Sequence, residues 1–360
     1  MFLILTINPG STSTKIAIFE DENCIMREEI YHPPEELARY KRIFEQYPLR
    51  RDAVLSFLEK SGIALSSLSA VVGRGGLMRP LESGTYLVNE KMLEDLKAPK
   101  EREHASNLGA FIAYEIAQKA GVPAFVVDPV CVDEFDDIAR ISGLPEIERK
   151  SLSHALNLKA AGRKAGKDLG KSYQELNLVI VHMGGGISVS AHRKGRMVDV
   201  NQALDGTGPF SPERAGGLPV GDVIRMCYSV PPYDKTRYTY EEMITKITRK
   251  GGLLAHLGTN DAREVERRIA QGDKHARLIY EAMAYQIAKE IGAMATVLKG
   301  EVDAIVLTGG LARSDILVGW IKERVSWIAP ILVYPGEDEM LAMAQGALRV
   351  LRGEEKAKEY

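Results

Sequence analysis

An α/β fold built from two similar halves is predicted by three features of the sequence. The chain of 360 residues is too long for one ordinary hydrophobic core and suits two domains. Predicted strands alternate with predicted helices in both halves, which is the pattern of the α/β class. A short apolar run, a polar turn and an alternating strand occur in this order twice, at residues 3–19 and again at residues 178–192.

Both copies of this pattern predict a strand, a turn, a second strand, a hairpin and a third strand. In the first copy, Leu3–Ile7 leads into Asn8-Pro-Gly-Ser-Thr-Ser-Thr-Lys15, and in the second, Leu178–Val181 leads into His182-Met-Gly-Gly-Gly-Ile-Ser188. Turns rich in Gly, Ser and Thr let backbone N–H groups and hydroxyls converge on an anion without obstruction by Cβ atoms. Either turn alone also fits an ordinary hairpin, but the matching pair predicts a nucleotide clamped between two domains.

The remaining elements are predicted from helical spacing, short buried runs and turn residues. In the first half they are a helix at 34–59, a strand at 70–72, a helix at 106–120 and a strand at 125–127. In the second half they are helices at 152–170, 240–249, 261–270, 273–299 and 337–351, strands at 303–307 and 331–334, and a Gly/Pro-rich loop at 205–219. The predicted domains are residues 1–150, joined by a C-terminal helix at about 340–360, and residues 151–339.

Composition excludes several classes of partner. With 47 basic and 49 acidic residues the net charge is −2, so no large field attracts nucleic acid or a membrane surface. The three cysteines are scattered, which favours a reducing compartment over a disulfide or zinc framework. Neither a signal peptide nor an uncharged window long enough to span a bilayer is recognised. We therefore expect a cytoplasmic protein that binds small molecules.

Two arginines lie in loops, where packing alone does not explain a long cationic side chain. Arg74 lies between glycines at the end of the strand at 70–72, and Arg214 lies in the Gly/Pro-rich loop. A surface salt bridge is the alternative for each. Two guanidinium groups in one pocket would suit an anionic substrate and a phosphoryl group in transfer, because each binds oxygens in a bidentate manner.

Other polar residues at strand ends are candidates for the same chemistry. His154 and His182 are two of seven histidines, and a satisfied core histidine is the alternative for each. Asp128 and Glu339 are candidate acids, and Mg²⁺ held largely by water and phosphate needs only one or two carboxylates. The acidic cluster at residues 133–137 is interpreted as a solvated loop. A third glycine turn, Thr308-Gly-Gly-Leu-Ala312, suits a nucleoside resting on bare backbone, and neither a P-loop lysine nor a full dinucleotide fingerprint accompanies it.

In combination these residues resemble the acetate/butyrate kinase family, within the superfamily of actin, sugar kinases and heat-shock ATPases. The resemblance covers essentially the whole chain. It is carried by Asn8-x-Gly-Ser-x-Ser-x-Lys15, Gly73-Arg-Gly-Gly76, His154-Ala-Leu-Asn157, His182-Met-Gly-Gly-Gly-Ile-Ser188, Gly208-Pro-Phe-Ser-Pro-Glu-Arg-Ala-Gly216, Thr259-Asn-Asp-Ala-Arg263 and Glu337-Asp-Glu339.

This resemblance implies two similar ribonuclease-H-like domains of the actin and acetate kinase type, with mixed sheets flanked by helices and a nucleotide cleft between them. It implies ATP/ADP and Mg²⁺ as cofactors and a homo-oligomer. The implied reaction is reversible phosphorylation of a short-chain carboxylate, butyrate or a branched relative, to an acyl phosphate. A sugar or polyol kinase with an Asp base and a non-catalytic ATP-binding switch remain as alternatives.

Site residues follow from the resemblance position by position. Arg74 and Arg214 would hold the carboxylate and stabilise the transferring phosphoryl group, and His182 would touch the γ-phosphate. His154 and Asp128 match further polar positions of the active site. Glu339 and Asn8 would contact the metal. The nucleotide would be held by Asn8, Ser11, Ser13, Lys15, Gly184, Gly185, Gly186, Asn260, Asp261, Arg263, Gly309 and Gly310.

Two departures from the acetate kinases bear on the substrate. Those enzymes carry His-Leu-Gly-Asn-Gly where this chain has His182-Met-Gly-Gly-Gly186, and a Phe where this chain has Ser153. If that Phe closes the acyl pocket, Ser153 leaves room for extra methylenes, each worth about 0.8 kcal/mol when buried. A longer acid than acetate is therefore expected.

Overall fold

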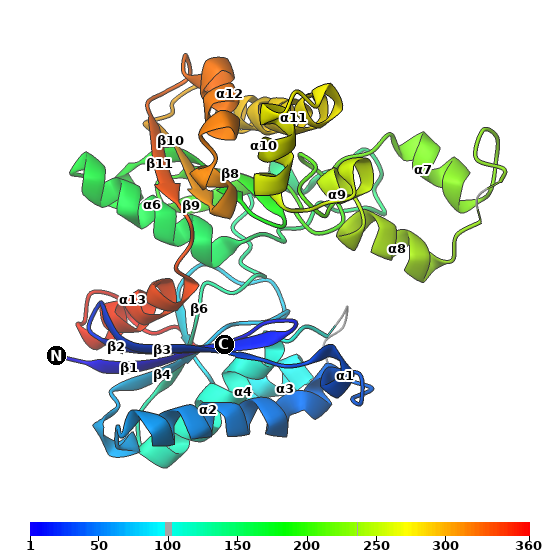
Figure 1. Ribbon diagram of the computed structural model, residues 1–360. Coiled ribbons are helices and arrows are strands. Elements are labelled where there is room, and N and C mark those ends of the chain that lie inside the picture. The colour runs from blue at the N-terminus through cyan, green and yellow to red at the C-terminus, as the bar shows by residue number, and fades with distance from the viewer. Residues whose placement is uncertain (98–102, 236) are drawn as a thin grey trace. The chain divides into compact units, whose positions relative to one another are not determined.

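A computed structural model describes residues 1–97, 103–235 and 237–360 of the chain (Figure 1). The chain divides into two compact units. Unit 1 comprises Met1–Asp133 and Asp338–Tyr360, and unit 2 comprises Glu134–Glu337. Each unit has its own mixed β-sheet flanked by helices and its own hydrophobic core, so the predicted α/β class is confirmed.

Unit 1 is organised around a sheet of the order β3-β2-β1-β4-β6-β5. The strands are β1 (Leu3–Pro9), β2 (Ser13–Glu20), β3 (Asn23–Tyr31), β4 (Ala70–Gly73), β5 (Thr85–Leu87) and β6 (Ala124–Val127). The first three form an antiparallel meander, whereas β4 is parallel to both β1 and β6. Parallel neighbours place their carboxyl ends at one edge, which is where ligands bind in such sheets.

The helices of unit 1 cover both faces of this sheet. They are α1 (Pro34–Leu37), α2 (Tyr47–Ser61), α3 (Glu90–Lys97), α4 (Asn107–Ala120) and α13 (Glu339–Leu351), with short 3₁₀ turns at Ile43–Gln46 and Leu65–Ser67. Figure 1 shows α2 and α4 on one face and α13 on the other. The single helix predicted at 34–59 is wrong. Pro48 lies in the first turn of α2, where its missing N–H is tolerated, whereas in a helix interior it would break the ladder.

Unit 2 repeats the plan with a sheet of the order β11-β10-β7-β8-β9. Its strands are β7 (Asn177–Met183), β8 (Ile187–Arg193), β9 (Arg196–Val200), β10 (Ala304–Gly309) and β11 (Ile331–Pro335). Again the first three form an antiparallel meander, and β10 is parallel to both β7 and β11. The order β9-β8-β7-β10-β11 therefore matches β3-β2-β1-β4-β6 in position and direction, as the repeated sequence pattern predicts.

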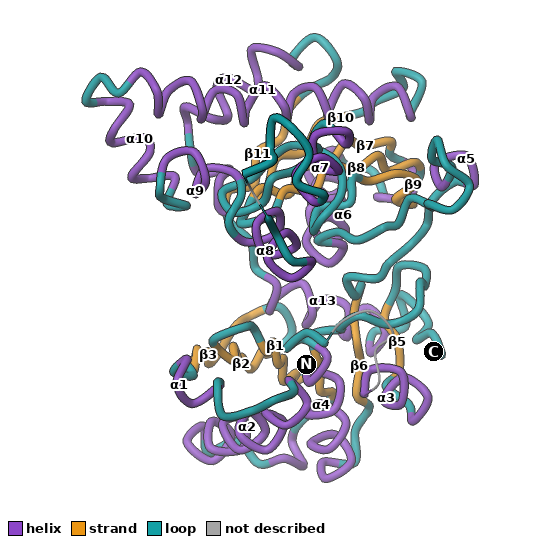
Figure 2. The backbone as a smooth tube through the Cα atoms, turned by 90° about the vertical axis from the view of Figure 1, so that its right-hand side faces the viewer, coloured by secondary structure: helices purple, strands orange, loops and turns teal. Residues whose placement is uncertain are grey.

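Helices also flank the sheet of unit 2. They are α5 (Asp137–Arg140), α6 (Ala155–Leu169), α7 (Val220–Cys227), α8 (Tyr240–Arg249), α9 (Gly252–Leu257), α10 (Ala262–Ala270), α11 (Lys274–Val297) and α12 (Asp315–Val325), with 3₁₀ turns at Tyr173–Glu175 and Gly310–Arg313. Helix α6 packs on β7 and β10, and α11 packs on β8 and runs beside α12 (Figure 2). The segment 205–219 is irregular, as predicted. None of the helices in the described part of the chain combines the length and apolarity needed to cross a bilayer.

The acidic cluster at 133–137 is only partly the solvated loop predicted from the sequence. Glu134 is buried and its Oε2 lies 2.5 Å from Lys159 Nζ, while Asp136 pairs with Arg193 at 2.7 Å. Glu134 Oε2 also accepts the backbone N–H of Met197. The prediction of a solvated carboxylate is wrong for Glu134, which is buried against Lys159, whereas Asp136 keeps 29 % of its side chain exposed.

Candidate active site

In unit 1, a cluster of polar side chains gathers where β1 and β4 end. Asn8 is at the end of β1, Arg74 directly follows β4, and Glu339 opens α13. Asn8 Nδ2 donates to Glu339 Oε2 at 2.6 Å, and Arg74 Nη2 lies 3.4 Å from Glu339 Oε1. Arg74 is only 6 % exposed, and its Nη1 finds no hydrogen-bond partner among the described residues. A buried guanidinium nitrogen of this kind is suited to an anionic ligand.

The backbone around Arg74 has no room for side chains. A Cβ at Gly73 would lie 2.2 Å from Gly109 O, one at Gly75 would lie 2.5 Å from Pro129 Cβ, and one at Gly76 would meet the side chain of Asn107. The glycines therefore have a packing reason, since β4 lies against the start of α4. This tight packing fixes the point from which the Arg74 side chain departs.

The turn between β1 and β2 carries three further predicted residues. Ser11 is exposed, and Ser13 Oγ donates to Glu29 Oε1 at 2.8 Å. Lys15 lies opposite Asn8 in the strand pair. The turn is closed by a hydrogen bond from the amide of Gly10 to the carbonyl of Ser13 at 2.7 Å.

Asp128 follows β6 in the same unit, fully buried and with a positive φ of 39°. Its Oδ1 accepts the hydroxyl of Ser83 at 2.6 Å and the amide of Gly84 at 2.8 Å. This carboxylate therefore anchors the loop before β5. A general base has to face a hydroxyl of the substrate, and these two donors already engage Asp128 Oδ1.

In unit 2, two histidines stack where β7 ends and α6 begins. The rings of His154 and His182 lie 4.2 Å apart between centroids with an angle of 28° between their planes. Ser188 Oγ is 2.9 Å from His154 Nδ1, and Glu337 Oε2 is 3.3 Å from His182 Nε2. Glu337 also accepts from Asn157 Nδ2 at 3.4 Å. Glu337 belongs to the Glu337-Asp-Glu339 motif, but the local sequence does not indicate its contacts with a histidine and an asparagine.

The triple-glycine turn after β7 makes space for Arg214. A Cβ at Gly186 would lie 2.2 Å from Arg214 Nη1, so this guanidinium passes directly over the turn. Arg214 Nη1 donates to the carbonyl of Ala203 at 2.5 Å. Ser211 ties the Arg214 loop to the turn, because its Oγ donates to Gly185 O at 2.6 Å and accepts the amide of Arg214 at 3.1 Å.

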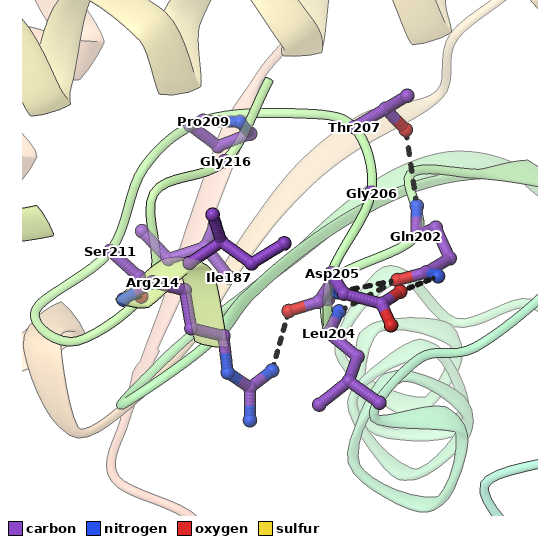
Figure 3. A pocket seen from close by; sticks show the side chains of 12 residues that line it. Ile187, Gln202, Leu204, Asp205, Gly206, Thr207, Pro209, Ser211, Arg214 and Gly216 are labelled. Atoms are coloured by element: carbon purple, nitrogen blue, oxygen red, sulfur yellow. Dashed lines mark hydrogen bonds between the residues drawn. The ribbon is translucent and has the colours of Figure 1, made fainter. Parts of the chain in front are cut away.

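A small cavity lies beside Arg214, as Figure 3 shows. It is enclosed largely by the loop between β9 and α7. The residues that line it are Ile187, Gln202, Ala203, Leu204, Asp205, Gly206, Thr207, Pro209, Ser211, Arg214, Gly216 and Ile247. Arg214 and Ser211 are the polar groups that connect this cavity to the glycine turn.

A second, larger pocket of about 630 Å³ brings together the residues predicted to frame adenosine. Asn260, Asp261, Arg263 and Gly310 line it, together with Ala262, Glu266, Leu311, Arg313 and Ser314. Asp261 caps α10, and the guanidinium of Arg263 holds the pKa of the Asp261 carboxyl below its usual range. Asn260 Nδ2 donates to Glu213 Oε1 at 2.6 Å, which links this pocket to the loop that carries Arg214.

Gly309 precedes the lining residue Gly310 in the chain and has to be glycine. Its φ is +92°, and a Cβ there would lie 2.4 Å from the carbonyl oxygen of Met183. The backbone of β10 therefore approaches that of β7 closely at the point where both strands end. Sequence reasoning missed Arg313, a cation of the same pocket, because nothing in the local pattern distinguishes it from a surface arginine.

The predicted site residues thus form two groups, one in each unit. Both groups lie at the carboxyl ends of the central parallel strands and beside Gly- or Ser-rich turns. This arrangement, with the buried Arg74 and the half-buried Arg214 near glycine backbone, is typical of an enzyme that handles phosphate groups. It defines a two-unit phosphotransferase as the class of protein.

The fold is that of the acetate and propionate kinases. The crystal structure of an acetate kinase from Porphyromonas gingivalis superimposes with a TM-score of 0.79 at 18 % identity, over 98 % of this chain and all of that one. A propionate kinase from Francisella tularensis gives a TM-score of 0.72 at 20 % identity, over 96 % of this chain and 99 % of the other.

Sequence comparison identifies the family. Residues 149–319 match the profile of the acetokinase family. Over all 360 residues, and over the whole length of the relative, the chain is 55 % identical to Butyrate kinase 1 of Clostridium acetobutylicum. The chain therefore belongs to the acetokinase family, whose members use ATP and ADP, and the resemblance predicted from the sequence is confirmed.

Proposed function

We propose that this protein is a butyrate kinase, which transfers the γ-phosphoryl group of ATP to the carboxylate of butyrate or a branched relative. The products are an acyl phosphate and ADP, and the reaction is reversible. The observation that carries this proposal is the full-length identity of 55 % to a protein named Butyrate kinase 1. Identity of this degree over both units favours the same acceptor group in the two proteins.

The chemistry of the acceptor fits the charges in the two groups of site residues. A carboxylate is ionised at neutral pH, so it attacks the γ-phosphorus without a general base. A new P–O bond forms to the carboxylate oxygen while the bond to the β–γ bridging oxygen breaks, and its electron pair leaves on ADP. Negative charge spreads over three equatorial oxygens in the transition state. Arg74, whose buried Nη1 meets no hydrogen-bond partner in the described part of the chain, and Arg214 would supply donors for that charge.

The residues around Glu339 fit a magnesium ion. Carboxylate and amide oxygens are the ligands that Mg²⁺ prefers, and one or two carboxylates are enough when water and phosphate complete the shell. Asn8 donates to Glu339 through Nδ2, so its Oδ1 faces the other way. Within the described residues no group of three or more His, Cys, Asp or Glu side chains forms a metal cage. Glu339 and Asn8 would hold the ion, which would neutralise charge on the phosphates.

In unit 2 we assign the nucleotide to the 630 Å³ pocket and the glycine turn. Asn260, Asp261 and Arg263 would frame the adenosine, and Gly310, with its chain neighbour Gly309, would offer bare backbone to it. Gly184, Gly185 and Gly186 would face the phosphates, and His182, oriented by Glu337, would touch the γ-phosphate. His154 would act through its stacking on His182.

A hydroxylamine trap tests the function directly, because acyl phosphates convert hydroxylamine to a coloured hydroxamate. The assay uses the purified full chain with ATP, Mg²⁺ and unbranched or branched acids of increasing length. We expect the highest kcat/KM with butyrate or a branched relative. No hydroxamate with any acid would contradict the proposal. ADP release with glycerol or a hexose would favour a sugar kinase, and tight ATP binding without turnover would favour a nucleotide switch.

A cytoplasmic location and a homo-oligomeric state complete the proposal. The three cysteines are free and two of them, Cys24 and Cys227, are exposed, which suits a reducing compartment. Helix α7 buries no residue and exposes Val220 and Ile224 one turn apart, which suits a contact with a second copy. Sedimentation equilibrium measures the oligomeric state, and a monomer at micromolar concentration would contradict that part.

A further inference from the structure

A fully buried arginine lies beneath the turn that joins β1 to β2. Arg50, on α2, has no exposed surface. Its Nη1 donates to the carbonyl of Ser13 at 3.0 Å and to Thr14 Oγ1 at 3.1 Å, and its Nη2 donates to the carbonyl of Ser11 at 3.3 Å. The side chain of Gln46 accepts from Nε at 3.2 Å and from Nη2 at 3.0 Å. One guanidinium therefore braces both ends of the turn.

Among the described residues, no carboxylate forms an ion pair with Arg50. Every hydrogen-bond acceptor that it meets among the described residues is a neutral oxygen. Burial lowers the pKa of Arg50 to about 10, which leaves it protonated at neutral pH. An unpaired buried charge is strongly unfavourable, so such groups are normally matched with the opposite charge. The exposed neighbour Arg51 has two such partners, Asp52 and Glu115.

Next to Arg50 lies His32, which shares a hydrogen-bond partner with it. Thr14 Oγ1 accepts from Arg50 and lies 2.9 Å from His32 Nε2. Burial and the charge of Arg50 lower the pKa of His32, which favours the neutral imidazole. The local charge of the pair is therefore one full positive unit.

The same contacts orient the peptide groups of the turn. The carbonyls of Ser11 and Ser13 face Arg50, and the carbonyl of Thr12 accepts the amide of His32 at 2.8 Å. Because a peptide group is planar and trans, the amide N–H of Thr12 points away from Arg50, on the opposite side from the Ser11 carbonyl. An outward amide N–H in a turn is the kind of donor that anion-binding turns use.

We propose that Arg50 is a positioning residue that holds the Gly10–Thr14 turn in its anion-binding form and supplies a positive charge that the polyphosphate of a bound nucleotide neutralises. The inference rests on the proposed function in one respect only, that this turn faces the phosphates. It adds to the site a residue from α2 that touches no substrate. Without Arg50, the carbonyl of Ser11 would lose this donor, and the carbonyl of Ser13 would keep only the amide of Gly10.

Affinity for inorganic tripolyphosphate tests the proposal without an acyl acceptor. Calorimetric titration of the purified full chain at low salt compares wild type with Arg50→Gln, Arg50→Lys and the control Arg51→Gln. The control removes the same charge from the neighbouring residue of the same helix, where it lies in surface ion pairs. We expect at least tenfold weaker binding for Arg50→Gln, an intermediate loss for Arg50→Lys, and a change under twofold for Arg51→Gln.

Steady-state kinetics separates this role from a general loss of stability. Arg50→Gln should raise KM for ATP about tenfold while KM for the carboxylate and the affinity for adenosine stay within twofold of wild type. A folded Arg50→Gln that keeps the wild-type affinity for tripolyphosphate and KM for ATP would overturn the proposal. If that variant does not fold, unchanged tripolyphosphate binding by Arg50→Lys, which cannot bridge both carbonyls, overturns it equally.

Failure of the proposed function gives a different result. If the wild-type protein makes no hydroxamate with any acid but binds tripolyphosphate in an Arg50-dependent manner, the inference about Arg50 stands and the butyrate kinase assignment is refuted. If the wild-type protein phosphorylates butyrate and its Arg50→Gln variant has a normal KM for ATP, only the inference about Arg50 is refuted.

Discussion

Substituting Gly186 by Ala should impair catalysis by displacing Arg214. The new Cβ would lie 2.2 Å from Arg214 Nη1 and 2.7 Å from its Cζ. To regain an ordinary contact of 3.4 Å, Nη1 has to move by about 1.2 Å. The backbone of Gly186 has no positive φ, so alanine itself introduces no backbone strain there. The substitution therefore acts on the guanidinium rather than on the turn.

The expected loss of rate follows from this displacement. A misplacement of about 1 Å in a group that stabilises a transition state can lower the rate by about 100-fold, equivalent to about 2.7 kcal/mol in the barrier. Loss of the hydrogen bond from Arg214 Nη1 to the carbonyl of Ala203 would lower the free energy of unfolding by only about 1 kcal/mol. We therefore expect kcat to fall far more than thermal stability or KM for ATP changes.

A double-mutant cycle with Arg214→Ala provides the assay. If Gly186→Ala acts through Arg214, it should change kcat far less in the Arg214→Ala background, where the tightest remaining contact of the new Cβ is His154 Cε1 at 3.2 Å. The hydroxamate rate with saturating butyrate measures all four proteins. Fully additive effects would refute the reasoning, and so would a Gly186→Ala enzyme with wild-type kcat.

Three further predictions concern other parts of the chain. Glu339→Gln should raise the Mg²⁺ concentration needed for half-maximal rate at least tenfold, because the carboxylate charge is lost; an unchanged requirement in a magnesium titration would exclude Glu339 as a metal contact. Burial holds the pKa of His192 well below 6.5, so only the unfolded chain takes up this proton as the pH falls below 6.5, and the free energy of unfolding should drop by up to about 1.4 kcal/mol per pH unit. Urea unfolding at several pH values measures that slope, which should be shallower in His192→Gln. Lys159→Met should destabilise the protein by about 3–5 kcal/mol because Glu134 is left buried without its cation, and adding Glu134→Leu should restore most of that loss in the same urea assay.

The paired meanders were predictable because their signals are local. Alternating apolar residues determine β2 and β8, and the Gly/Ser turns determine where β1 and β7 end. The helix that follows the first meander was misjudged because its apolar spacing continues across the irregular segment before Pro48. The spacing of apolar residues does not show that a proline has to lie in the first turn of a helix.

Residues whose meaning depends on distant partners could not be interpreted from the sequence. Arg50 stands beside Arg51 and Asp52 in a charged stretch that is indistinguishable from a solvated helix face, and only tertiary packing turns it inward. Glu134 belongs to an acidic cluster in the sequence, yet Lys159, on the following helix α6, buries it. Charged residues are almost never fully buried, so sequence reasoning assigns them to the surface by default.

Because the two sheets have matching strand orders, equivalent positions in the two units can be compared for their chemistry. Strand β4 of unit 1 and strand β10 of unit 2 occupy the same place beside their first strands, and both end in glycine, at Gly73 and Gly309. The next residue is Arg74 in one unit and Gly310 in the other. One duplicated position thus carries a buried cation in unit 1 and bare backbone in unit 2. A cation suits a carboxylate or a phosphoryl group in transfer, whereas bare backbone suits a flat nucleoside.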